Sequence, residues 1–99
     1  PSQHQAKVVR TIAMAAGEAL RNSVRHAGPD TSRRVEITLS ATLIRVCVRD
    51  DGVGYTPDPH SQRLGVQRSI VDRMADLGGS ARIDTAPGRG TEVVLTWPT

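Results

Sequence analysis

Three polar residues, Glu18, Asn22 and His26, follow one another at four-residue steps in the first third of the chain. In a helix this spacing places them in one column along the border of an apolar stripe. The amide oxygen of Asn22 is a suitable ligand for Mg²⁺, which keeps several waters and takes one or two protein oxygens beside substrate phosphates. Glu18 could orient a metal-bound water, and Arg25 and His26 could contact phosphate oxygens. An ordinary solvated helix flank remains the competing interpretation.

A second set of residues, 50–54 (DDGVG), follows an apolar run. Asp50 is in phase with Val48, so its carboxylate should point to the buried side at the end of a strand. A buried carboxylate needs a partner, and the exocyclic amine of adenine is one such donor. Gly52 and Gly54 would let the backbone approach the base. The alternative is an Asp-Gly turn in which Asp50 caps local amides.

Two further positions add weaker signals. Gly65 precedes a predicted helix, and the N-terminus of a helix binds phosphate readily, with Arg63 or Arg68 as further contacts. Thr91 follows a glycine-rich turn and is in phase with the next apolar residues, so its hydroxyl could enter the same pocket as Asp50.

Hydrophobic periodicity shows which elements must position these residues. The predicted elements are a helix over 5–27, strands over 35–40 and 44–49, a polar loop over 50–63, a helix over 66–77, and strands over 81–85 and 91–97. Leu20 and Val24 are expected to widen the apolar stripe of the first helix. Two helices with one apolar stripe each need a common apolar surface, which a four-stranded sheet supplies. We therefore expect a single α+β domain over residues 1–99, built as a two-layer sandwich.

Composition excludes several classes of protein. The 99 residues are 37% hydrophobic and 23% charged, which indicates one compact domain, and no stretch could span a bilayer or act as a signal peptide. The net charge of +3 comes from basic residues interleaved with acids, and Tyr55 and Trp97 are the only aromatic residues, which argues against a nucleic-acid module. The single cysteine, Cys47, is expected in the core and suits a reducing compartment.

Together and in this order, the motifs resemble the catalytic and ATP-binding domain of sensor histidine kinases, in the superfamily of gyrase, Hsp90, histidine kinase and MutL ATPases. Residues 18–26 look like the family's N box, 50–54 like its first glycine box and 88–91 like its closing Gly-x-Gly-Thr. The Leu-Gly-Gly stop at 77–79 is most similar to the nitrate sensors and the membrane-fluidity sensor. The resemblance implies a Bergerat-type fold with a mixed sheet, two main helices on one face, and ATP beneath a mobile lid.

The resemblance also implies roles for individual residues. It makes Asn22 the Mg²⁺ ligand, Asp50 the adenine reader and Thr91 a support for the base, with Glu18 acting on the incoming histidine. The predicted catalytic residues are therefore Glu18 and Asn22, and the predicted ATP-binding residues are Asn22, Arg25, His26, Asp50, Gly52, Gly54, Gly65 and Thr91. The implied cofactors are ATP and Mg²⁺. The implied partners are a histidine-containing dimerisation domain and, indirectly, a response regulator, in the cytoplasm and without membrane contact by this domain.

The chain departs from the family pattern in three respects. Gly65 stands where relatives have Gly-x-Gly, the lid over 55–63 is short, and no dimerisation helix precedes His4, which has no supporting acid and is read as incidental. The expected activity is that of a protein-histidine kinase domain without its acceptor. An anti-sigma-factor-like serine kinase and a degenerate nucleotide-sensing domain are the alternatives, with a nucleic-acid module a distant third.

Overall fold

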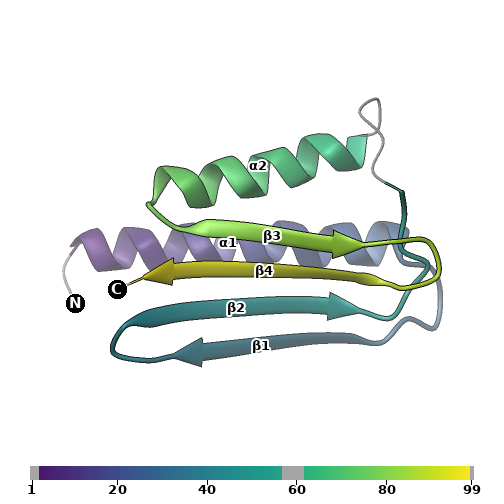
Figure 1. The fold of residues 1–99 in the computed structure, drawn as a ribbon, viewed down its shortest axis with the longest axis horizontal. Coiled ribbons are helices and arrows are strands. Elements are labelled where there is room, and N and C mark those ends of the chain that lie inside the picture. Colours follow the sequence, from purple (N-terminus) through teal and green to yellow (C-terminus); the bar gives the residue numbers. More distant parts are fainter. Residues whose placement is uncertain (1–2, 57–61, 99) are drawn as a thin grey trace.

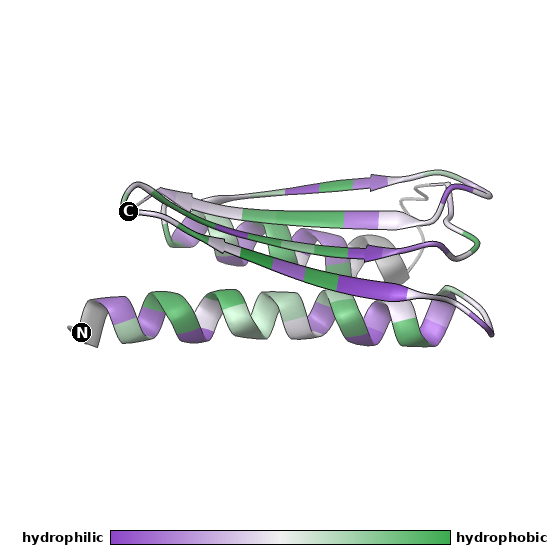
Figure 2. Cartoon of the chain, turned by 90° about the horizontal axis from the view of Figure 1, so that it is seen from below, coloured by the Kyte–Doolittle hydropathy of each residue, from purple (hydrophilic) through white to green (hydrophobic). Residues whose placement is uncertain are grey.

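The computed structural model describes residues 3–56 and 62–98, with side chains described over 5–56 and 65–98. Its elements are α1 (Gln3–His26), β1 (Arg33–Leu39), β2 (Leu43–Asp50), α2 (Gln62–Asp76), β3 (Ser80–Thr85) and β4 (Thr91–Pro98). The strand order is β1-β2-β4-β3 (Figure 1). Both helices lie on one face of this sheet (Figure 2), so the predicted α+β two-layer sandwich is confirmed.

The sheet differs from expectation in its strand directions. All three pairings among the described strands are antiparallel, whereas the family resemblance implied a mixed sheet. The sheet consists of two hairpins, β1–β2 and β3–β4. They are joined by the antiparallel pairing of β2 with β4. The cross-strand pair Asp50–Thr91 lies at the end of this central junction. The topology therefore brings together two predicted site residues that are 41 positions apart in the chain.

The core lies between the sheet and the two helices. Its buried members are Val8, Ile12, Ala15, Ala19, Val46, Val48, Ile70, Met74, Val93 and Leu95. Small residues on α1 let this helix approach the sheet closely, since Ala15 is fully buried. Helix α1 ends where Gly28 adopts a φ of 97°. Neither described helix is long and apolar enough to cross a membrane.

Helix α2 begins earlier than the sequence indicates. It starts at Gln62 and not at Val66, so Gly65 lies inside the helix and not in a preceding loop. One glycine costs a helix only about 1 kcal/mol, and the burial of Ile70 and Met74 outweighs this cost. The stop is as predicted: Gly78 has a φ of 85°, and the Gly79 amide donates to the Met74 carbonyl at 2.9 Å.

Strand β1 is more exposed than its alternating pattern predicts. Val35, Ile37 and Leu39 face the helix side of the sheet yet are 46%, 65% and 71% exposed, because α1 packs on β2 and β4 and does not cover this edge. Leu20 and Val24 are likewise exposed and do not widen the core stripe.

Cys47 is buried as expected, but it lies on the sheet face away from the helices. Its neighbour across the β2–β4 pairing is Val94, which is also buried. Burial raises the pKa of the Cys47 thiol, and the negative charge of Glu92 raises it further.

Candidate functional site

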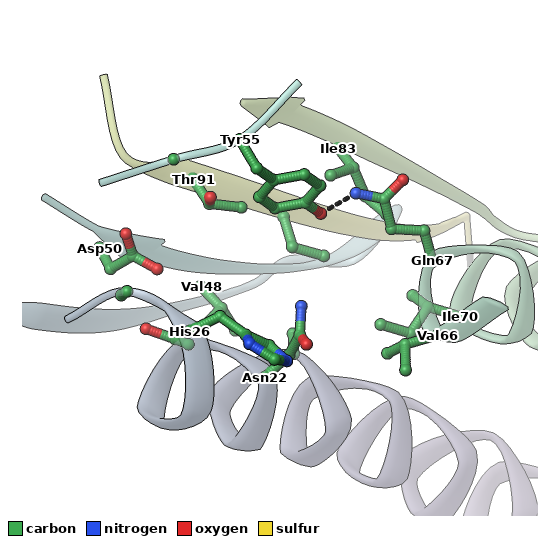
Figure 3. A pocket seen from close by; sticks show the side chains of 15 residues that line it. Asn22, His26, Val48, Asp50, Tyr55, Val66, Gln67, Ile70, Ile83 and Thr91 are labelled. Atoms are coloured by element: carbon green, nitrogen blue, oxygen red, sulfur yellow. Dashed lines mark hydrogen bonds between the residues drawn. The ribbon is translucent and has the colours of Figure 1, made fainter. Parts of the chain in front are cut away.

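A pocket lies between α1, the end of β2, the start of β4 and the first turns of α2 (Figure 3). Its polar lining residues are Asn22, Ser23, His26, Asp50, Tyr55, Gln67 and Thr91. Its apolar walls come from both helices and the sheet, for example Ala19, Val48 and Ile70. Five residues of the predicted ATP-binding set, Asn22, His26, Asp50, Gly54 and Thr91, are thus brought together.

Asp50 is the last residue of β2 and is 7% exposed. Its Oδ1 accepts a hydrogen bond from the Gly52 amide at 3.0 Å, so the local-cap interpretation is correct for one oxygen. Among the described residues, no group donates to Oδ2, and the side chain lies at one end of the pocket (Figure 3). One oxygen therefore holds the turn, and the other can accept from a ligand.

Thr91 is held by the hydroxyl of Thr85, a residue that was not among the predicted site residues. The Thr85 hydroxyl donates to the Gly90 carbonyl at 3.1 Å, and its oxygen lies 2.9 Å from Thr91 Oγ1. Because Thr85 uses its own proton on Gly90, Thr91 is the donor in the second contact. Thr91 Oγ1 therefore presents lone pairs to the pocket. The cross-strand pairing of Thr85 with Thr91 is the signal that could have identified this contact.

The glycines after β2 make close contacts with the protein's own backbone. A Cβ on Gly52 would lie 2.4 Å from the Ala27 carbonyl oxygen, and one on Gly54 would lie 2.0 Å from the Ala86 oxygen. Gly54 also has a φ of 59°, a left-handed conformation. These glycines dock the segment against α1 and the β3–β4 turn. The close approach to a base, predicted for both residues, is thus not needed to explain them, although Gly54 lines the pocket.

A wider cleft of about 550 Å³ adjoins the pocket on the solvent side. Its lining includes Glu18, Arg21, Asn22, Arg25 and Gly65. Asn22 lines both spaces and so marks their junction. A Cβ on Gly65 would meet nothing within 4 Å, so no described protein contact requires a glycine there.

Glu18 is paired with Arg73, a residue that was not among the predicted site residues. Its Oε1 lies 2.8 Å from Arg73 Nη1 on α2, and both side chains are about three-quarters buried, with 23% and 29% of their surfaces exposed. Nη1 has no acceptor in hydrogen-bonding geometry, so the contact is an ion pair without an aligned hydrogen bond. This pair connects α1 with α2 beside the cleft.

Some predicted features lie outside the described part of the chain. These are the side chains of Arg63 and His4 and most of the predicted lid, residues 57–61. Arg68 is described and exposed. Among the described residues, no group of three His, Cys, Asp or Glu side chains could hold a metal. A Mg²⁺ ion that takes one amide oxygen from Asn22 and its other ligands from phosphate and water fits this donor set.

Residues 7–99 match the family model described as histidine kinase-, DNA gyrase B-, and HSP90-like ATPase. The chain is 36% identical over 85 residues to the sensor histidine kinase NarS of Mycobacterium tuberculosis, covering 82% of this chain and 20% of that protein. It is 27% identical over 110 residues to the anti-sigma F factor of Oceanobacillus iheyensis, covering 97% of this chain and 71% of that protein.

Solved structures show the same architecture. The histidine kinase domain of the blue-light activated histidine kinase from Erythrobacter litoralis EL346 superposes with a TM-score of 0.73 at 26% identity, covering 89% of this chain and 43% of that one. The mycobacterial sensor histidine kinase MprB, at 19% identity and a TM-score of 0.67, shares the fold and covers 90% of this chain and 70% of that one. The chain thus spans only part of these kinases. With nearly its whole length matched, the chain belongs to the family of histidine kinase-, DNA gyrase B- and HSP90-like ATPases.

Proposed function

We propose that this chain is the ATP-binding catalytic domain of a sensor histidine kinase, which binds Mg-ATP and donates the γ-phosphate to a histidine on a separate dimerisation domain. One observation carries the proposal. Asp50 and Thr91 present acceptors inside an apolar pocket, and Asn22 joins that pocket to an open cleft that contains Glu18 and Arg25. A base and a triphosphate need two such adjoining environments.

This arrangement orients the nucleotide. The adenine amine has two protons, which match the free oxygen of Asp50 and the lone pairs of Thr91. Guanine carries a carbonyl at the equivalent position, which would face two acceptors without a proton between them. The site therefore favours ATP over GTP.

The phosphates extend past Asn22 into the cleft, where Arg25 supplies positive charge. When bound there, Mg²⁺ would neutralise phosphate charge, with the Asn22 amide oxygen as its protein ligand. Glu18, held by Arg73, would accept a proton from the imidazole of the incoming histidine. Transfer of this kind depends mainly on positioning and charge.

Asp50→Asn, measured by calorimetry with Mg-ATP, tests the proposal. Loss of a charged acceptor costs about 1.5–3 kcal/mol, so binding should weaken roughly 10- to 100-fold. Asp51→Asn is the matched control, because the Asp51 carboxylate accepts from the Ser32 amide at 2.8 Å and lines neither the pocket nor the cleft. The proposal fails if the wild type produces no heat, or if Asp50→Asn binds as tightly as Asp51→Asn.

An anti-sigma-factor-like serine kinase is the second candidate, because the match to the anti-sigma F factor spans 97% of this chain. The two functions differ in the phosphorylated product. Phosphohistidine is hydrolysed by acid, whereas phosphoserine is stable. Labelling the full-length gene product and its protein partners with γ-labelled ATP, followed by acid treatment, therefore decides between them.

A further inference from the structure

The aromatic ring of Tyr55 stands inside the pocket (Figure 3). The free volume that remains is about 20 Å³, room for one or two water molecules. A cavity that accepts benzene measures about 150 Å³, and adenine is larger than benzene. The pocket in this conformation therefore cannot admit the base.

A hydrogen bond at its tip connects the Tyr55 side chain to α2. Gln67 Nε2 on α2 donates to the phenol oxygen, as the dashed line in Figure 3 shows. The Tyr55 backbone is anchored separately, because its amide donates to Thr85 Oγ1 at 3.2 Å. The same Thr85 oxygen contacts Thr91, so the backbone of Tyr55 belongs to the framework of the pocket. The ring can leave the pocket by side-chain rotation while this backbone anchor stays in place.

We propose that Tyr55 and Gln67 determine the nucleotide affinity of this site: the Tyr55 ring occupies the place of the base, and ATP binds only when the ring rotates out and the bond to Gln67 breaks. The inference rests on the proposed function, since it takes ATP as the ligand. A conformation that excludes the ligand lowers the apparent affinity in proportion to its population. One hydrogen bond of ordinary strength corresponds to roughly a fivefold effect on Kd.

A double-mutant cycle tests the contact. Tyr55→Phe keeps the ring and removes the phenol oxygen, and Gln67→Met keeps the side-chain length and removes the donor. Each should tighten Mg-ATP binding roughly fivefold, and the double variant should bind no more tightly than either single variant. Asp72→Asn, an exposed change on the same helix, is the control and should leave the affinity unchanged.

The wild-type protein supplies a second measurement, because Tyr55 is its one tyrosine and Trp97 its one tryptophan. Protein labelled with 3-fluorotyrosine and 5-fluorotryptophan gives one ¹⁹F signal for each residue. Mg-ATP should increase the broadening of the Tyr55 signal by a neutral gadolinium chelate, because the ring moves into solvent. Trp97, whose indole donates to the Leu77 carbonyl at 2.9 Å near the other end of β4, should be unaffected.

The outcomes separate this inference from the proposed function. If ATP binds, but the variants have the same Kd as the wild type or the Tyr55 ring stays shielded from the chelate, the proposed role of Tyr55 and Gln67 is wrong. The proposed nucleotide site is unaffected by that result. If ATP binds to none of the proteins, the proposed function fails and the inference fails with it. Tighter binding to both Tyr55→Phe and Gln67→Met than to the wild type would support both.

Discussion

The two carboxylate oxygens of Asp50 have different partners. Oδ1 accepts from the Gly52 amide, while Oδ2 has no donor among the described residues. The relay from Thr91 through Thr85 to the Gly90 carbonyl leaves Thr91 as a second acceptor. The hydrogen-bond framework of the protein thus creates a pair of acceptors, and under the proposed function this pair would select an amine-bearing base.

A second prediction at the residue scale concerns Asn22 and the dependence of ATP binding on Mg²⁺. Calorimetry with ATP in Mg²⁺ and in EDTA should show tighter binding with the metal for the wild type. Asn22→Ala should abolish this difference, because the Asn22 amide oxygen is the proposed protein ligand of Mg²⁺. Binding in EDTA should change less. An equal Mg²⁺ effect in both proteins would contradict the assignment.

At the scale of elements, two glycines of the predicted site occupy opposite environments. Gly52→Ala would place a Cβ 2.4 Å from the Ala27 carbonyl oxygen, whereas a Cβ on Gly65 in α2 meets nothing. Gly52→Ala should therefore lower the free energy of unfolding by about 1–3 kcal/mol. Gly65→Ala should raise it by up to about 1 kcal/mol through helix propensity. Urea denaturation of the two variants measures both changes. Equal effects would contradict the close contact between Gly52 and Ala27.

An ion-pair network across β2, β3 and β4 predicts pH dependence. Glu92 on the open face of the sheet accepts from Arg49 Nε at 2.9 Å and lies 3.7 Å from Arg82. The hydrogen bond from Arg49 holds the pKa of Glu92 below its usual value of 4.5. A lowered pKa stabilises the folded state at pH values above 4.5. The contribution is lost as the pH falls through the lower value of the folded state.

Urea unfolding of the wild type and Glu92→Gln at pH 7 and pH 3.5 checks this dependence. The difference in the free energy of unfolding between the two proteins should be present at pH 7 and smaller at pH 3.5, because protonated glutamic acid is neutral, as glutamine is. The pair is partly exposed, so a modest effect is expected. A difference that does not depend on pH would contradict the network.

At the scale of the whole molecule, 99 residues enclose a small core, so a ligand should contribute much of the stability. Mg-ATP at one hundred times its Kd adds about 2.7 kcal/mol, which for a domain of this size raises Tm by roughly 10–20 °C. Differential scanning fluorimetry measures the shift. GTP and Asp50→Asn should give much smaller shifts, and equal shifts with GTP would contradict the proposed base recognition.

The sequence by itself determined the elements and the positions of the central site residues. Period-two alternation predicted the inward direction of Asp50 and Thr91, and the four-residue column on α1 predicted that Asn22 overlooks a cleft. Both are local geometric consequences of strand and helix repeats. The same local rules failed at Gly65, where tertiary packing extends α2, and at β1, where alternation cannot show that α1 leaves the edge strand uncovered.

Only the tertiary structure revealed the contacts between distant segments. Arg73 beside Glu18, Thr85 behind Thr91, and Gln67 on Tyr55 each join residues from different elements, and no single periodic pattern contains both partners. Their pairing depends on how α2 lies against α1 and how the two hairpins meet. The sequence therefore indicated several of the side chains that line the pocket and the cleft, and the packing of the helices and hairpins decided which contacts hold them and which side chain fills the pocket.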